Sequence, residues 1–119
     1  MNIKIDVLNL PEFAGKVDEA AAGVRTAASK EVITSLIKIE SGAKRRCPVR
    51  TGRLRSSIHT EIESDLSGSV GTNVEYGPHV EWGTVKRPAR PFLYPAFDEE
   101  TPLLVGRLET AIKEAVGGK

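Results

Sequence analysis

The side chains that could act in catalysis or hold a metal ion are few and scattered. His59 lies in an alternating segment and His79 in an irregular one, and neither has the spacing of a metal-ligand pair. Cys47 is the single cysteine and stands at the expected end of a helix, where the dipole does not favour a thiolate. The acids Asp98 to Glu100 fit the first turn of a helix. We therefore expect no catalytic residue, no metal site and no cofactor.

Basic side chains gather in one short segment. Six of the 17 Lys and Arg residues fall within 12 positions, and no acid occurs between Glu40 and Glu61. These six are Lys44, Arg45, Arg46, Arg50, Arg53 and Arg55. Two interpretations stay open: the cluster is a solvated helix end that pairs with carboxylates of a neighbouring subunit or partner, or it contacts nucleic-acid phosphates without reading sequence. The net charge of +1 excludes a protein that coats nucleic acid with its whole surface.

Aromatic residues gather in a second segment. Five of the six lie within 22 positions, on both sides of a proline-containing basic loop at 85–91. Each ring taken singly could pack in the core, but aromatic and arginine residues together are typical of protein interfaces. We predict a subunit or partner interface that contains Tyr76, Trp82, Lys86, Arg87, Arg90, Phe92, Leu93 and Tyr94.

Length and composition limit the class of protein. A chain of 119 residues is the usual size of one domain, so we expect residues 1–119 to form a single domain. A hydrophobic fraction of 39% excludes disorder over the whole length. No apolar run approaches the roughly 18 residues that a membrane span needs, and we expect neither a membrane protein nor a secreted one.

The first third of the chain predicts a strand and a long helix. Apolar and polar residues alternate over 3–7, as in a half-buried strand, and Pro11 ends this pattern. From about Phe13 to Cys47 the apolar residues recur three or four positions apart, which predicts one amphipathic helix. Its expected buried face contains Val17, Ala20, Ala21, Val24, Ala28, Val32, Leu36, Ile39 and Ala43.

A short helical turn and a hairpin should follow. Thr51 can cap a turn that runs through Leu54. Alternation over 58–63 predicts a strand, Ser67-Gly68 supplies the expected turn, and 69–74 should return as the second strand. Ile58, Thr60 and Ile62 are expected on one face of the first strand.

The last third predicts a single helical turn, an exposed loop and a final helix. The segment 75–84 can form one turn that ends at Gly83, and the loop 85–91 should be exposed. Pro95 suits the first turn of the final helix, whereas Pro102 either kinks that helix or opens a new one. The expected class is therefore α+β, with a long N-terminal helix and a C-terminal helix packed on a small antiparallel sheet.

Three segments occur in a fixed order: CPVRTGRLRSSI at 47–58, GTNVEYGPHVEWGT at 71–84 and RPFLYPAF at 90–97. Together they resemble the small head-tail connector proteins of tailed bacteriophages, which are also called neck or tail-completion proteins. That family carries P-V-x-T-G-x-L-x-x-S-I, Y-A-x-x-V-E-x-G-T and P-F-L-x-P-A in the same order. With the flanking helices, the resemblance covers roughly residues 10 to 116.

The resemblance implies a structural virion protein made in the host bacterial cytoplasm. It implies a homo-oligomeric ring, commonly sixfold, at the junction of head and tail. Such a ring joins the head connector to tail-tube or tail-terminator proteins, and double-stranded DNA passes through its lumen. The basic segment 44–55 would then be a candidate for lumen-facing, non-specific contact with DNA. The alternative is a small nucleic-acid-binding regulator that uses this same segment.

A structural role predicts that the histidines are dispensable. Replacing His59 and His79 by alanine should leave particle assembly intact, because neither belongs to a catalytic or metal-binding constellation. Complementation of a phage that lacks the gene, with the folding of the variant checked by circular dichroism, measures this. Complete loss of infectivity by a normally folded variant would contradict the prediction.

Overall fold

The fold is an elongated rod with extents of 57 × 21 × 19 Å. The computed structural model describes residues 1–7, 22–48 and 52–117. In chain order the elements are β1 (Asn2–Asp6), α1 (Ala22–Arg46), α2 (Arg53–Ser57), β2 (His59–Ser64), β3 (Ser67–Gly71), α3 (Gly77–Trp82) and α4 (Leu93–Gly117). Two long helices pack with a small antiparallel sheet, so the predicted α+β class is confirmed.

The sheet has three strands in the order β1-β3-β2, and both pairings are antiparallel. Ile3 stands opposite Val70, and Ile5 stands opposite Gly68. Ile3, Ile5 and Val7 are buried, as their alternation predicts. The N-terminal strand is therefore an integral edge of the sheet.

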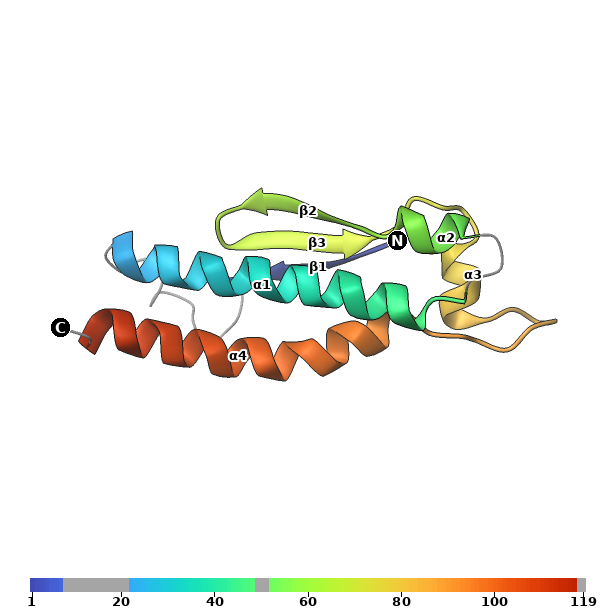
Figure 1. Cartoon of the computed structure of the whole chain (residues 1–119). Helices are drawn as coiled ribbons and strands as arrows, with labels where there is room; N and C mark the ends of the chain where they lie inside the picture. Colours follow the sequence, from blue (N-terminus) through green and yellow to red (C-terminus); the bar gives the residue numbers. More distant parts are fainter. Residues whose placement is uncertain (8–21, 49–51, 118–119) are drawn as a thin grey trace.

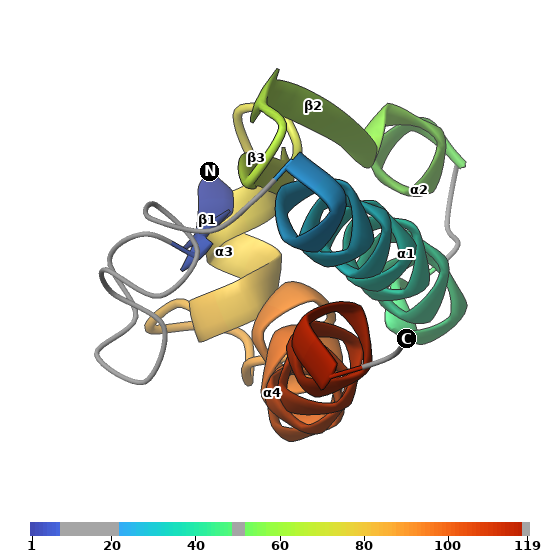
Figure 2. The ribbon, with the colours of Figure 1, turned by 90° about the vertical axis from the view of Figure 1, so that its left-hand side faces the viewer.

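Helix α1 lies between the sheet and α4 (Figures 1 and 2). The predicted apolar face from Val24 to Ala43 is buried along its length. Leu36, which is fully buried, lies directly over Gly68 of β3. The expectations about Pro11, about the helix before Ala22 and about the Thr51 cap lie outside the described residues.

Helix α4 runs without interruption from Leu93 to Gly117, with Pro102 inside it. Pro102 is exposed, so its ring lies on the solvent side of the helix. Thr101 does not cap a new helix, because its hydroxyl donates to the carbonyl of Phe97 within the same one. Leu104 and Leu108 are buried as expected, whereas Ala115 is exposed near the end of the helix.

A buried polar cluster joins the two long helices. The Ser35 hydroxyl of α1 donates to the Glu100 carboxylate of α4 at 2.9 Å. Arg107 bonds both of these groups and also donates to Glu31 at 3.0 Å. Because each polar group is satisfied, the cluster can sit between the helices without the cost of an orphaned donor or acceptor.

The hairpin differs from the prediction in the position of its turn and in the exposure of Ile62. The turn is at Asp65-Leu66, and Ser67-Gly68 belongs to β3, which ends at Gly71 rather than at residue 74. Burial of Leu66 explains the shift, since its side chain enters the core and its carbonyl accepts from Val7. Ile62 is 58% exposed, and it lies on β2, which is an edge strand of the sheet.

The short elements gather at one end of the rod. Helices α2 and α3 and the loop 84–91 lie together, far from the C-terminus (Figure 1). The predicted single turn that ends at Gly83 is confirmed as α3, and the loop that follows is exposed. No helix among the described residues is long and apolar enough to cross a membrane.

Substitution of Gly68 tests how closely α1 packs on the sheet. A Cβ there would lie 2.6 Å from Leu36 Cδ1 and 2.8 Å from the carbonyl oxygen of Glu61. Gly68→Ala should therefore lower the free energy of unfolding by about 1–3 kcal/mol through overpacking. A Cβ at Gly106 in α4 would meet nothing, so Gly106→Ala should raise stability by about 0.5–1 kcal/mol. Urea titration measures both, and equal effects would contradict this packing.

Candidate partner-binding end

A buried carboxylate organises the end of the rod that carries α3 and the 84–91 loop. Glu81 of α3 has 0% relative exposure. Its Oε1 accepts from the backbone N–H of Phe92 at 3.2 Å and of Leu93 at 2.9 Å, and its Oε2 accepts from Tyr94 at 3.3 Å. These N–H groups stand at the start of α4, where a helix leaves its donors unsatisfied and its dipole favours negative charge. Glu81 therefore caps α4 from another helix.

The loop 84–91 is tied to α3 at both of its ends. Gly83 ends α3 with φ 81°, and a Cβ there would lie 2.7 Å from the backbone nitrogen of Ala89. The Arg90 N–H donates to the carbonyl of Val80 at 2.8 Å, which returns the chain to α3. Within the loop, Thr84 and Arg87 exchange backbone hydrogen bonds. The loop is therefore exposed and hydrogen-bonded, with a fully exposed Val85.

A groove of about 970 Å³ opens between α2, α3 and this loop. Its walls combine apolar side chains with basic groups. They are formed by Pro48, Gly52, Leu54, Tyr76, His79, Val80, Thr84, Arg87, Pro88 and Arg90. The predicted interface residues Tyr76, Arg87 and Arg90 thus share one concave surface, to which Leu54 and Val80 add apolar surface.

The other predicted interface residues divide between surface and core. Trp82 is 61% exposed and packs on Tyr94, with ring centroids 4.8 Å apart and planes at 50°. Lys86 is exposed on the loop. Phe92 and Leu93 have 0% exposure, which corrects their place in the predicted interface: they anchor the start of α4 in the core.

The basic cluster is partly neutralised within the chain. Arg53 makes two hydrogen bonds to Glu75 and lies over the Tyr76 ring, with Cζ 5.4 Å from the centroid. Lys44 pairs with Glu40 at 3.1 Å. The fold brings these acids, which lie outside the basic segment, next to it.

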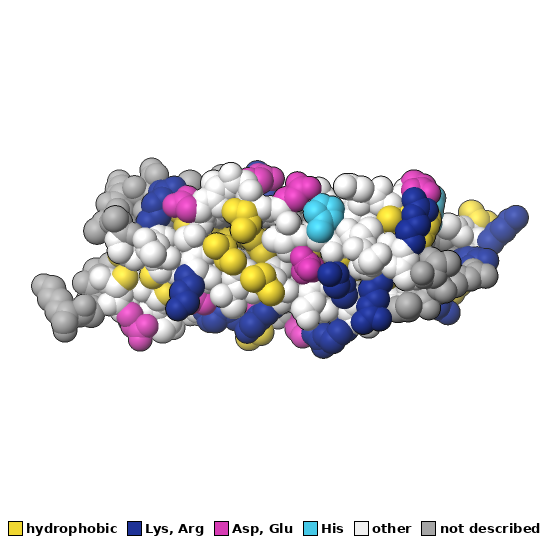
Figure 3. All heavy atoms as spheres, turned by 45° about the horizontal axis from the view of Figure 1, so that its top comes forward, with side chains coloured by type: hydrophobic (Ala, Val, Ile, Leu, Met, Phe, Trp, Pro, Cys, Tyr) yellow, Lys and Arg dark blue, Asp and Glu magenta, His cyan; other side chains and the backbone are white. Residues whose placement is uncertain are grey.

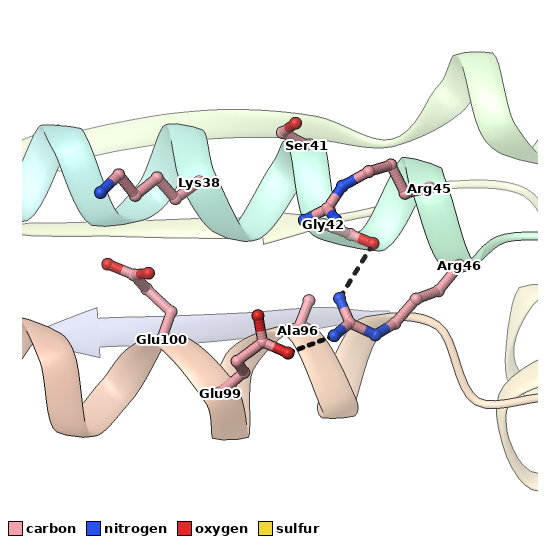
Figure 4. Close-up of a pocket in the computed structure, with 8 residues that line it drawn as sticks. All are labelled: Lys38, Ser41, Gly42, Arg45, Arg46, Ala96, Glu99 and Glu100. Carbon is pink, nitrogen blue, oxygen red and sulfur yellow. Dashed lines mark hydrogen bonds and ion pairs between the residues drawn. The ribbon is translucent and has the colours of Figure 1, made fainter.

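Three further members of the cluster have different positions. Arg46 reaches across to α4, where it pairs with Glu99 and donates to the carbonyl of Gly42 (Figure 4). Arg45 and Arg55 are exposed and make no ion pair among the described residues, whereas Arg50 lies outside them. Arg45 also lines a hollow of about 280 Å³ between α1 and α4, together with Lys38 and Ser41.

The candidates for chemistry have ordinary structural partners. His59 Nδ1 donates to the carbonyl of Ser57 at 2.8 Å, and this bond together with Glu61 raises the pKa of His59. Burial raises the pKa of the Cys47 thiol, which is the opposite of what a reactive thiolate needs. His79 is exposed in the groove wall. Among the described residues no group of His, Cys, Asp or Glu side chains could hold a metal ion.

The sequence does not single out Glu81, which stands within the segment GTNVEYGPHVEWGT without a capping pattern around it. One feature of the sequence could have indicated it. Glu81 stands between the apolar residues Val80 and Trp82, eleven positions before Phe92, which precedes α4. A buried cap supplied by another helix leaves no local pattern of the kind that a Ser or Asp cap leaves at its own helix.

Comparison with protein families identifies the class. Residues 9–83 match the family model described as "Bacteriophage HK97-gp10, putative tail-component". The chain therefore belongs to the HK97-gp10-like family of phage tail components, and the predicted resemblance to head-tail and tail-completion proteins is confirmed. The match includes α3 with Glu81 and ends before the 84–91 loop. No curated protein and no solved structure matches the chain.

Removal of the Glu81 carboxylate should destabilise the fold. Glu81→Ala leaves three N–H groups at the start of α4 without their acceptor, two of them buried, and should cost about 2 kcal/mol or more. Glu81→Gln keeps one acceptor oxygen and should fall between Glu81→Ala and the wild type. Glu75→Ala, at an exposed acid, is the control and should change stability little. Thermal unfolding checks the order, and equal stability of all variants would contradict it.

Proposed function

We propose that this chain is the repeating subunit of a ring at the head-tail junction, where it completes the tail and joins it to the head connector. Membership of a phage tail-component family supports a structural role in the virion rather than an enzymatic one. In the proposed ring, double-stranded DNA passes through the lumen. The subunit is made in the cytoplasm of the host bacterium and ends in the particle.

The observation that carries this proposal is the construction of the loop end of the rod. Trp82 and Val85 expose large apolar side chains beside the three bases of the loop 84–91. The water-exposed parts of these side chains do not stabilise a monomer, whereas aromatic and arginine side chains are preferred in partner contacts. The Glu81 cap and the Gly83 turn hold this loop at the end of a rigid rod.

The chemistry of this end indicates the kind of partner. The groove is lined by apolar side chains and by Arg87 and Arg90. A partner surface with an apolar anchor and carboxylates at its rim would satisfy both features. We assign this role to the neighbouring ring, which is the head connector or a tail-tube or tail-terminator protein.

Contact with DNA is a smaller part of the proposal. Lys44, Arg46 and Arg53 are engaged by Glu40, Glu99 and Glu75, so the cluster is weaker as a phosphate-binding surface than its sequence indicates. This distribution argues against the alternative of a small nucleic-acid-binding regulator. Scattered, weak phosphate contacts suit a lumen through which DNA must move.

Charge reversal on the loop tests the proposed junction. Arg87→Glu/Arg90→Glu should impair the joining of heads to tails without unfolding the subunit, because both side chains are exposed. Electron microscopy of lysates from a complemented deletion phage counts free heads, free tails and joined particles.

The control for this experiment is Glu114→Lys, a charge reversal at an exposed residue near the C-terminal end of α4 and outside the loop. This control should allow normal joining. Full assembly with the double loop variant, at wild-type stability, would reject the loop as the contact surface.

A further inference from the structure

The outward face of α1 is basic with an apolar centre. Its exposed side chains recur at helical spacing on the side opposite the buried face. They are Lys30, Ile37, Lys38, Ser41 and Arg45. No acid of α1 interrupts this set, and its three bases make no ion pair among the described residues. Lys38, Ser41 and Arg45 also border the hollow toward α4 of the same chain, whose other side carries Glu99 and Glu100. Ile37 is 59% exposed. In Figure 3, Lys and Arg side chains lie mostly along the lower side of a central apolar patch, and Asp and Glu side chains lie along its upper side.

The outward face of α4 has the complementary character. Five of the exposed residues of α4 follow one another three or four positions apart and form this face. They are Asp98, Pro102, Gly106, Glu109 and Lys113. The two acids have no ion-pair partner among the described residues, and Gly106 presents open space at the surface. The centre of this face is therefore small and flat, with an acid on either side.

The two faces match in detail when the helices are laid antiparallel. If Lys30 is set against Glu109, then Ile37 stands opposite Pro102, because both separations are seven residues. Asp98 then stands opposite Ser41, one turn from both Lys38 and Arg45. Lys113, the one base of the α4 face, stands opposite the uncharged Thr26. Each acid meets bases and the apolar centres coincide, as complementary interfaces require.

We propose that the occupant of the α1 face is α4 of a second copy of this chain. The inference rests on the proposed ring and names the surfaces that build it. Within the chain α1 and α4 already lie side by side and antiparallel (Figures 1 and 2). An antiparallel contact between copies repeats this arrangement, so all rods point the same way. Two different faces of one chain then meet head to tail, which closes into a ring when the rotation allows.

This arrangement fixes the orientation of the other surfaces. All loops 84–91 lie at one rim of the ring, where they can meet the adjoining ring together. In this ring Arg45 lies near Asp98 of the neighbouring subunit, so its charge is no longer available for contact with DNA. Arg55 is then the described member of the basic cluster that remains exposed without an acid beside it.

Disulfide trapping tests the contact directly. We would prepare full-length Ile37→Cys and Pro102→Cys chains, mix them at high concentration and oxidise them. The facing positions should form a heterodimer that neither chain forms alone, since a disulfide needs Cα atoms within about 7 Å. A chain with both changes should give a ladder whose largest closed species counts the subunits of the ring. Buried Cys47 is common to every sample and serves as background.

Charge exchange tests the match of the two faces. Lys30→Glu/Lys38→Glu, introduced into the Ile37→Cys chain, should abolish the heterodimer through repulsion by Asp98 and Glu109. Asp98→Lys/Glu109→Lys, added to the Pro102→Cys chain, should restore it. Gly106→Gln should also block trapping, because its side chain would fill the open space at the centre of the α4 face.

Each outcome of these trapping experiments either supports or overturns the proposed contact. A heterodimer and a ladder that respond to charge exchange support the proposed contact. Homodimers of the Ile37→Cys chain alone, or no trapping at any concentration, overturn it. If electron microscopy then still shows rings, or the loop variants still fail to join heads to tails, the proposed function stands and the subunits meet through other surfaces.

Discussion

The carboxylate of Glu81 is the contact on which the structure of the candidate partner-binding end depends. A fully buried carboxylate is expensive unless its oxygens are occupied, and here they are occupied by the first backbone donors of α4. This carboxylate joins α3 to α4, which begins twelve residues after Glu81. The chain between them must leave and return at nearly the same place, so it forms a projecting loop. The position of Trp82, Val85 and Arg87 therefore follows from the cap.

The two long helices carry this end because their rotation is fixed. An apolar seam alone would tolerate small rotations of α4 on α1, since dispersion contacts are weak singly and lack direction. The bonds among Ser35, Glu100 and Arg107 are directional and lie inside the contact. They set which residues of α4 face outward. The charged faces of the rod are thus a consequence of a buried network.

Much of the fold could be predicted from the sequence, because its main elements have regular periods. The strand at 3–7, the face of α1 and the turn at Gly83 follow from patterns that a few residues determine. The hairpin turn was misplaced by two residues, since Leu66 is drawn into the core by contacts distant in sequence. Pro102 remained ambiguous because its tolerance depends on which side of α4 meets solvent.

The residue types of the candidate site could be predicted from the sequence, but the contacts among them could not. Clustering identified the bases and the aromatic rings, and Trp82 and Arg90 do lie at the surface. Sequence could not reveal that Glu75 and Glu99 fold back onto the basic segment, nor that Phe92 is sealed in the core. Both depend on long-range contacts.

The exposed edge strand β2 bears on how such a protein survives in a crowded cell before its partners appear. An open edge can recruit strands from other chains and lead to aggregation. Here the exposed strand carries the charged side chains of Glu61 and Glu63, which pair with His59 and Lys4, and the irregular pairing between Ile62 and Ser64 interrupts its register. Strand addition is thereby discouraged while the helices stay accessible. A subunit made in excess can then remain dispersed and be used when the particle needs it.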